Sequence, residues 1–316
     1  FEVSASGSSL TYQWSSGAIP LNDAYGLQLH IPNVEMANAG AYFAHVTGKD
    51  WYEKLTTIVS IPAFLTVLPA VAVPIPNGIV GWWRAEDNLE NAISAANAAE
   101  LLNPSAFLGY DGGKCGHAFQ FLDRTAGLRL PITTPLSSFT FEAWVLPQEA
   151  ADARPIWEQR NPNNGQRLTL SMSATRPGSI ELTYVNSSGT YVLASSLGAM
   201  RSGVFQHVVV TYEAPGPLKI FVNGQLAASS TATLPFGFGA YDLYLGFAES
   251  RSLANTGFMG KMDEVALYNR ALTSAEIASV YGASRAGKIP PCKAAPANQV
   301  CWWQAEINQT DVYANN

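Results

Sequence analysis

The sequence contains few charged residues. Only 13% of its 316 residues are charged, about half of the roughly 25% that is usual in soluble domains. Its 18 Lys and Arg residues against 24 Asp and Glu residues give a formal net charge of −6, and no basic cluster could follow a phosphate backbone. This composition argues against a nucleic-acid partner, and the many Ser, Thr, Asn, Gly and aromatic residues favour an extracellular β protein.

Cysteines are scarce and long hydrophobic runs are missing. Cys115, Cys292 and Cys301 are too few for a disulfide scaffold and lack the spacing of a zinc site. Cys292 and Cys301 could close a small loop, or Cys115 could pair with one of them or with another module. Prolines interrupt the apolar run 61–75, so no segment reaches the ~20 residues of a membrane-spanning helix. We expect no membrane insertion here.

The residue patterns of common catalytic sites are also missing. No alternating run of acidic residues places two carboxylates about 5 Å apart on one face of a strand. Asp263 and Glu264 are adjacent, so we expect them to point to opposite faces. The four histidines are scattered, and no nucleophile elbow or phosphate loop is present. The sequence therefore predicts that this chain is not an enzyme.

The residue patterns that are present predict an all-β protein. Short segments with alternating apolar residues are separated by turns, and the segment 139–145 places every second apolar residue on one face. Asn223 and Gly224 between two such segments indicate a tight hairpin. Thr273 and Glu276 form a capping box that predicts one short helix ending near Tyr281.

Residues 1–68 resemble a bacterial immunoglobulin-like domain. Trp14 matches the buried tryptophan of that fold, and Tyr42 follows a turn beginning at Asn38 and matches its tyrosine corner. The inter-sheet cysteines are absent, with Ala44 at the position of the second, so we expect the core to be held by packing alone. The resemblance implies a first strand before Phe1. The Pro-rich segment 69–77 is expected to be a stiff, extended linker.

Residues 78–284 resemble the laminin G-like, concanavalin A-like jelly-roll family of bacterial surface proteins. The segment 122–128 departs from the family pattern, which places acidic residues there. The matching motifs, in family order, are Gly-Trp-Trp at 81–83, Gly-His-Ala-Phe-Gln-Phe at 116–121, Phe-Thr-Phe-Glu-Ala-Trp-Val at 139–145, Gln-His-Val-Val-Val-Thr-Tyr at 206–212, Ile-Phe-Val-Asn-Gly at 220–224 and the segment 260–272.

One motif occurs twice. Val-Gly-Trp-Trp-Arg-Ala-Glu at 80–86 recurs as Val-Cys-Trp-Trp-Gln-Ala-Glu at 300–306, at a constant offset of 220 (302 − 82 = 220). We interpret residues 285–298 as a second linker and residues 299–316 as the start of a second laminin G-like repeat. The sequence would then be a fragment of a longer multidomain protein, with an immunoglobulin-like sandwich followed by concanavalin A-like jelly rolls.

The resemblance implies a structural Ca²⁺ where the first and last strands of the jelly roll meet. Calcium takes six to eight oxygen ligands. Glu86, Asn88 and Asn91 follow the expected first strand, and Asp263 lies on the expected last one. These four residues are the candidate metal ligands. The alternative is that they are loop residues and that Asp263 pairs with a basic group or with backbone amides.

Aromatic residues offer candidate sugar-binding positions, because sugars stack their apolar faces on exposed rings. The alternative for each ring is packing in the core of a sandwich. The candidates are Trp157, Tyr184, Tyr191, Phe238 and Tyr241.

We interpret the chain as part of a secreted or surface-attached bacterial protein that serves adhesion or scaffolding without catalysis, with glycan binding as one means of doing so. Its expected partners are a glycan or another surface protein, and neighbouring modules of the same chain. One alternative is a structural subunit of a surface fibre or layer without a ligand. A second alternative is an accessory carbohydrate-binding region of a larger secreted polysaccharide-degrading enzyme.

Overall fold

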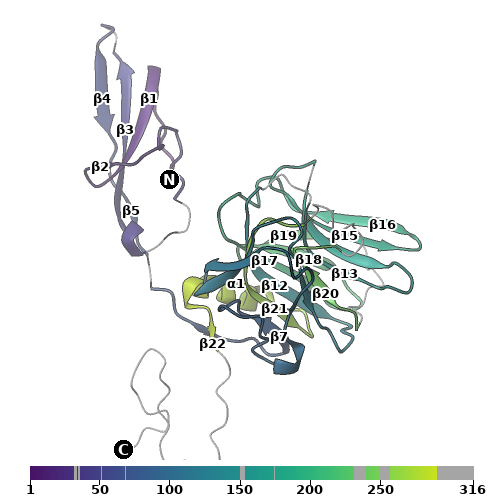
Figure 1. Ribbon diagram of the computed structural model, residues 1–316. Helices are drawn as coiled ribbons and strands as arrows, with labels where there is room; N and C mark the ends of the chain where they lie inside the picture. Colours follow the sequence, from purple (N-terminus) through teal and green to yellow (C-terminus); the bar gives the residue numbers. More distant parts are fainter. Residues whose placement is uncertain are drawn as a thin grey trace, which may run out of the picture.

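The computed structural model describes residues 1–31, 34, 36–50, 52–67, 69–149, 154–173, 175–230, 240–248 and 257–289. These residues form an N-terminal β-sheet domain and a larger domain of two packed sheets, joined by a single chain segment (Figure 1). One α-helix, α1 (Ser274–Ala283), lies among the described residues. The predicted all-β fold is confirmed.

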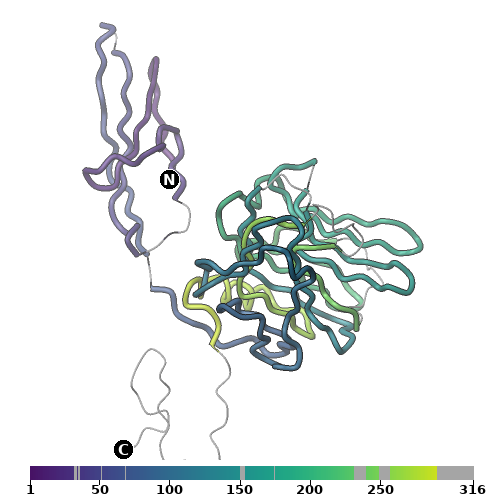
Figure 2. The backbone as a smooth tube through the Cα atoms, viewed as in Figure 1, coloured from purple at the N-terminus to yellow at the C-terminus, as the bar shows by residue number. Residues whose placement is uncertain are grey.

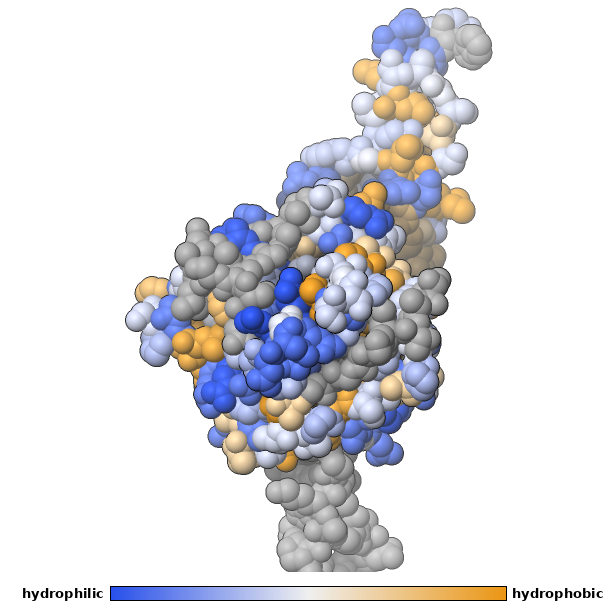
Figure 3. Space-filling view, turned by 90° about the vertical axis from the view of Figure 1, so that its right-hand side faces the viewer, coloured by the Kyte–Doolittle hydropathy of each residue, from blue (hydrophilic) through white to orange (hydrophobic). Residues whose placement is uncertain are grey.

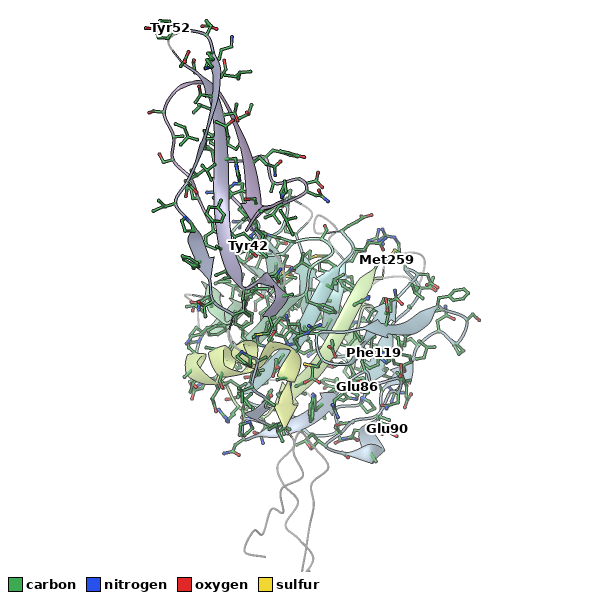
Figure 4. All side chains as sticks on the ribbon, turned by 90° about the vertical axis from the view of Figure 1, so that its left-hand side faces the viewer. Tyr42, Tyr52, Glu86, Glu90, Phe119 and Met259 are labelled. Atoms are coloured by element: carbon green, nitrogen blue, oxygen red, sulfur yellow. The ribbon has the colours of Figure 1, made fainter. Side chains whose placement is uncertain are left out.

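The N-terminal domain contains a single five-stranded sheet among its described residues. The strand order is β2-β1-β3-β4, and β5 pairs with the beginning of β3. Figure 4 labels Tyr52 at the tip of this domain, where its side chain is 90% exposed. The strands are β1 (Ser8–Ser16), β2 (Ile19–Pro20), β3 (Gly40–Lys49), β4 (Leu55–Val59) and β5 (Ala63–Leu65).

A small core supports one face of this sheet. Trp14 and Tyr42 are buried there together with Ala44, and the Tyr42 hydroxyl donates to the Asn38 carbonyl oxygen at 2.7 Å. This bond is the one expected of a tyrosine corner. The two aromatic residues are therefore buried as predicted, whereas the immunoglobulin-like assignment of the whole domain stays a prediction.

In the described part of the larger domain, the strands form an eight-stranded and a seven-stranded antiparallel sheet. The first has the order β19-β18-β17-β12-β21-β10-β9, with β7 paired to β21, and the second has the order β16-β15-β14-β13-β20-β11-β8. The first sheet contains β7 (Ile79–Trp83), β9 (Leu108–Gly112), β10 (His117–Phe121), β12 (Phe139–Pro147), β17 (Gln206–Tyr212), β18 (Leu218–Val222), β19 (Gln225–Ser229) and β21 (Gly260–Tyr268). The second contains β8 (Glu100–Leu101), β11 (Leu128–Leu130), β13 (Pro155–Arg160), β14 (Arg167–Met172), β15 (Ile180–Asn186), β16 (Gly189–Ala194) and β20 (Leu243–Leu245).

The main core lies between these two sheets. On β12, Phe139, Phe141, Ala143 and Val145 all point into it, as the alternation of the sequence predicts. They meet leucine side chains of the seven-stranded sheet, and Phe141 packs against Trp157 with 5.2 Å between ring centroids. The alternation therefore also fixes which side chains of each sheet face outward.

The helix α1 covers the outer face of the eight-stranded sheet. Its Ile277 packs in a second apolar cluster with Trp82, Val209 and Phe221. The helix begins with the predicted capping box, in which Thr273 and Glu276 exchange hydrogen bonds. The predicted Asn223-Gly224 turn also forms, with both residues at positive φ. Central strands of this sheet are thus buried on both faces.

The segments on either side of the jelly roll pair with each other. In the predicted linker 69–77, β6 (Val73–Pro74) pairs in parallel with β22 (Lys288–Ile289). Lys288 also has a buried partner on the eight-stranded sheet, described below. The domain boundaries at 69–77 and 284 stay predictions. Figure 2 shows the single connection between the two domains. The predicted second repeat at 299–316 lies outside the described residues.

Candidate functional site

A row of hydrogen-bonding side chains crosses the outer face of the seven-stranded sheet. Strand register places Arg129 opposite both Glu100 and Tyr244, and Tyr244 opposite Glu158. The row continues through Thr169 and Thr183. Neighbouring residues on these strands, such as Leu128 and Leu245, belong to the core, so the row points away from it. We call this row the outer polar row.

Ion pairs and hydrogen bonds hold several members of the outer polar row in place. The Arg129 guanidinium donates to Asp242 at 2.8 Å and to Glu100 at 3.0 Å, and its side chain is 39% exposed. Thr169 donates to the buried Glu158 carboxylate at 2.8 Å. The preset orientation of these groups lowers the entropy cost of contacting a ligand.

Two further arginines face each other at the end of the same sheet face. Arg160 on β13 is directly opposite Arg167 on β14. The Arg160 Nε atom is buried without a hydrogen-bond partner. Like charges directly opposite on neighbouring strands are destabilising, so this pair costs stability unless an acceptor group approaches it.

Two of the five predicted sugar-binding rings are core residues. Trp157 and Tyr184 are 0% and 1% exposed and pack in the main core, so neither can stack on a sugar. Side chains alternate between the two faces of a strand. The residue that follows each ring on its strand faces outward, so both rings face the core. For these two rings the predicted binding role is wrong.

The other three predicted rings differ in position. Tyr191 is 40% exposed on the edge strand β16, where it stacks on Tyr184 with 6.0 Å between centroids. Tyr241 precedes β20 and is half-buried, and its carbonyl oxygen accepts a hydrogen bond from Gln159. Phe238 lies outside the described residues. Tyr244 was not predicted as a binding residue, because it stands between the apolar Leu243 and Leu245 in a short strand.

Glu86 and Asp263, two candidate metal ligands, contact the same hairpin from two sides. Asp263 accepts backbone hydrogen bonds from Lys114 and Cys115 at 2.7 and 2.9 Å. Glu86 accepts from His117 at 3.2 Å. The first and last strands do pair, β7 with β21, as the resemblance implies. Figure 4 shows Glu86 in the jelly roll at the end away from Tyr52.

Backbone N–H groups occupy the side-chain oxygens of two candidate metal ligands, Asn88 and Asn91. Asn91 Oδ1 accepts backbone hydrogen bonds from Trp82, Ile93 and Ser94, and Asn88 Oδ1 accepts one from Glu90. Among the described residues, no three His, Cys, Asp or Glu side chains converge on one point. Calcium binding therefore stays a prediction and is no part of the site described above.

A buried charged cluster lies beneath the C-terminal segment, on the outer face of the eight-stranded sheet. Lys288 Nζ is 2.8 Å from Glu142 Oε1 and 3.4 Å from Glu264 Oε2. Tyr268 donates to Glu142 at 2.9 Å, and Trp82 Nε1 donates to Glu264 at 3.1 Å. These side chains are almost inaccessible to solvent.

The charges of this cluster are set by burial and by Lys288. Burial alone would raise the pKa of Glu142, but Lys288 and His207 lower it to about 2. Burial raises the pKa of Glu264, and Lys288 only partly opposes this rise. Glu142 and Lys288 therefore form one complete buried ion pair.

A β-bulge corrects the prediction that Asp263 and Glu264 point to opposite faces. Met262 and Val265 both belong to the main core, and the register of β12 with β21 shifts between them. Glu264 adopts a positive φ of 55°. The two carboxylates therefore both point away from the core, because the bulge inserts an extra residue. They are 0% and 2% exposed and lie out of reach of a substrate.

Cys115 carries a free, buried thiol. Burial raises its pKa to about 12, and its Sγ lies 3.1 Å from the Ser284 carbonyl oxygen. Cys292 and Cys301 lie outside the described residues, so their predicted pairing stays a prediction. Among the described residues, no helix is long and apolar enough to cross a membrane.

Solved structures with this fold include several binding domains. Domain 4 of AbnA, an extracellular arabinanase from Geobacillus stearothermophilus solved with arabinotriose, is 19% identical, with a TM-score of 0.52 over 63% of this chain and 96% of that one. The binding domain of Paraclostridial Mosquitocidal Protein 1 is 15% identical, with a TM-score of 0.52 over 65% and 52% of the two chains. A sialidase of Trypanosoma rangeli is 18% identical, with a TM-score of 0.50 over 76% and 42%. At these identities the likeness concerns the fold.

No curated protein matches the chain, but one family model matches part of its sequence. The model of the concanavalin A-like lectin/glucanases superfamily matches residues 123–278, which run from the loop before β11 to the middle of α1. The matched residues supply most of both sheets, the outer polar row except Glu100, and the capping box of the helix. The larger domain of this chain is thus a concanavalin A-like jelly roll.

Proposed function

We propose that this chain is a non-catalytic glycan-binding part of a secreted, modular protein. The outer polar row is the observation that carries the proposal. It lies on the seven-stranded sheet, whereas the described helix α1 packs on the other sheet. Sugars are recognised by a few fixed polar groups combined with an aromatic face, and Arg129, Tyr244 and Thr183 supply both on this surface.

The arginines add a preference for acceptor oxygens. Guanidinium groups donate in a planar fork that matches carboxylates and neighbouring hydroxyls. Arg129 is oriented by Asp242 and Glu100. No carboxylate among the described residues forms an ion pair with Arg160 or Arg167, which makes an incoming acceptor favourable. On the side shown in Figure 3, described hydrophobic residues are scattered among hydrophilic ones, as on a surface that meets polar ligands.

The likeness to known structures supports the proposal at the level of the fold. The arabinanase domain was solved with arabinotriose, and it is a separate domain of an extracellular enzyme. A concanavalin A-like jelly roll hosts many functions, so the ligand of this chain has to be found by experiment.

The test is a glycan array probed with the full chain and with Arg129→Ala and Tyr244→Ala variants. We expect a defined set of glycans to bind, and each variant to lose about tenfold in affinity, which corresponds to about 1.4 kcal/mol. Lys219→Ala, on β18 of the other sheet, is the matched control and should bind as the original chain does.

Two results would overturn the proposal. Binding that is unchanged in both variants would place the glycan elsewhere on the molecule. Failure to bind any glycan, together with assembly of the chain into fibres, would favour a structural subunit of a surface layer.

A further inference from the structure

Arg160 and Arg167, which we call the arginine pair, lie where the β13–β14 hairpin begins to turn. Arg160 is the last residue of β13, Arg167 is the first residue of β14, and the two are directly opposite each other. The Asn161 N–H donates to the Gln166 carbonyl oxygen at 2.7 Å one step further along the hairpin. Because hydrogen-bonded and non-hydrogen-bonded pairs alternate between antiparallel strands, the arginines form a non-hydrogen-bonded pair, with Cα atoms about 4.5 Å apart. Their side chains therefore start from a close spacing.

The arginine pair shares its sheet face with the outer polar row. Arg160 follows Glu158 by two residues and Arg167 precedes Thr169 by two residues, while Glu158 and Thr169 are opposite each other in the row. Side chains two residues apart on a strand point to the same face. Both arginines are half-buried on this face, so a ligand that lies on the outer polar row can also reach them.

No carboxylate of the described residues forms an ion pair with either arginine. Glu158 is buried, with 1% of its surface exposed, and Asp242 already accepts from Arg129 at 2.8 Å. The Arg160 Nε atom is buried without a hydrogen-bond partner. Two like charges on facing strands and an unpaired buried donor both cost stability. An anion that bound between the two guanidinium groups would remove both costs at once.

The turn that closes this hairpin supplies neutral donors beside the arginine pair. Asn161 Oδ1 accepts from the Asn163 N–H at 2.9 Å, and Asn164 Oδ1 accepts from the Gln166 N–H at 3.0 Å. Gly165 closes the turn at a φ of 73°, which a residue with a side chain rarely adopts. These bonds use the amide oxygens and fix the turn. The Nδ2 groups of Asn161 and Asn164 donate to no described residue and are suited to sugar hydroxyl groups.

We propose that the arginine pair binds the anionic group of an acidic glycan, which is a carboxylate or a sulfate on a sugar ring. This inference rests on the proposed function, because it names the class of glycan that the outer polar row takes. Guanidinium groups from two strands can hold one anion between them, each donating in a planar fork. The acidic sugar then lies at the β13–β14 turn, and the rest of the glycan follows the outer polar row toward Tyr244.

Isothermal titration calorimetry on the full chain tests this proposal with two matched pairs of oligosaccharides. A galacturonic acid tetramer is compared with its methyl ester, and a κ-carrageenan tetrasaccharide is compared with its desulfated form. We expect the chain to bind at least one acidic member about tenfold more tightly than its neutral counterpart, which corresponds to about 1.4 kcal/mol. The pair that shows this difference identifies the anion as a carboxylate or a sulfate.

Variants of the arginine pair locate the anion. Arg160→Gln and Arg167→Gln should each bind the acidic member about tenfold more weakly, and the neutral member within about threefold of the original chain. Neither should lower the melting temperature, and Arg167→Gln should raise it by about 1–3 °C because the two like charges no longer face each other. Arg176→Gln removes the same charge from an exposed position after β14. This control should bind as the original chain does.

Several outcomes would overturn the inference. One is equal affinity for the acidic and neutral members, and another is failure to bind either acidic oligosaccharide. Undiminished binding of the acidic member by both variants would do the same, and weaker binding with a lower melting temperature in both would assign the arginines a structural role. The glycan array separates these results from a failure of the proposed function. Neutral glycans that bind through Arg129 and Tyr244 would leave that function standing, whereas the absence of any glycan binding would overturn both.

Discussion

Lys288 is a buried cation whose main partner, Glu142, lies 146 residues away in the sequence. Its side chain is 1% exposed, and its ammonium group bonds to Glu142 on β12 and approaches Glu264 on β21. It also lies 5.5 Å from the centroid of the Trp82 ring. A buried ion pair adds little to stability relative to apolar packing, but removing one partner leaves an uncompensated charge.

Replacing Lys288 by Met should lower the unfolding free energy of the jelly roll by about 3–5 kcal/mol, because Glu142 then lies buried without its cation. Chemical denaturation followed by tryptophan fluorescence measures this change. The double variant Glu142→Gln/Lys288→Met should lose less than the two single variants added together.

The half-buried Lys219 on β18 provides a comparison for this effect. Lys219→Met should change the unfolding free energy by less than about 1 kcal/mol. A Lys288→Met protein as stable as Lys219→Met would show that the C-terminal segment does not dock on the cluster in solution.

At the scale of elements, the start of α1 is secured by one carboxylate. Glu276 accepts from the Thr273 backbone in the capping box and from both terminal nitrogens of Arg270. The hydrogen bonds from Arg270 are the main cause that lowers the pKa of Glu276 to about 2. Arg270 also donates to the Asn77 carbonyl oxygen. Its side chain therefore connects the segment before β7 to the start of α1.

This contact makes the jelly roll sensitive to acid. The folded-state pKa of Glu276 lies below the unfolded value of about 4.3, so its contribution is complete above pH 4.3 and is lost as the pH falls toward 2. Glu276→Gln should cost about 1 kcal/mol at pH 7, and the difference from the original chain should shrink below pH 4. Thermal unfolding measured from pH 2 to 7 tests this.

Glu53→Gln is a suitable reference for that titration. Glu53 is 77% exposed in a surface pair with Lys49, which is worth about 0–1 kcal/mol at most. If the stability gap of Glu276→Gln stayed constant down to pH 2, the titration of Glu276 would not be its cause.

Elements with strong local signals could be predicted from the sequence. The alternation in β12, the Asn223-Gly224 turn and the Thr273–Glu276 capping box are each encoded within a few residues. The bulge at Glu264 and the pairing of Lys288 with Glu142 could not be predicted, because they depend on contacts over more than 100 residues. The outer polar row was missed for the same reason, since its members come from separate strands.

At the scale of the whole molecule, the hydrogen bonds of the candidate metal ligands predict how the stability of the jelly roll responds to calcium. The oxygens of Asn88 and Asn91 are engaged by backbone N–H groups, so the jelly roll should hold together without a metal. We expect its melting temperature to change by less than about 2 °C on addition of EGTA or of 5 mM CaCl₂, which is less than the ~2–4 °C that 1 kcal/mol produces in a domain of this size. Differential scanning calorimetry measures this.

A rise in melting temperature with calcium that EGTA reverses would contradict this expectation. Asp263→Asn would then identify the ligand. It keeps an oxygen near the Lys114 and Cys115 backbone and removes the charge, so a site that includes Asp263 would lose its response to calcium.

The parallel pair β6–β22 has a mechanical consequence. The Val73 N–H donates to Gly287 O and the Ile75 N–H to Ile289 O, so the strands that enter and leave the jelly roll run side by side in one direction. Tension applied along the chain pulls the two strands past each other and loads their hydrogen bonds in shear. The hydrogen bonds between β6 and β22 then carry the tension. The two sheets of the jelly roll bear little of it as long as residues 73 to 289 stay connected through this strand pair.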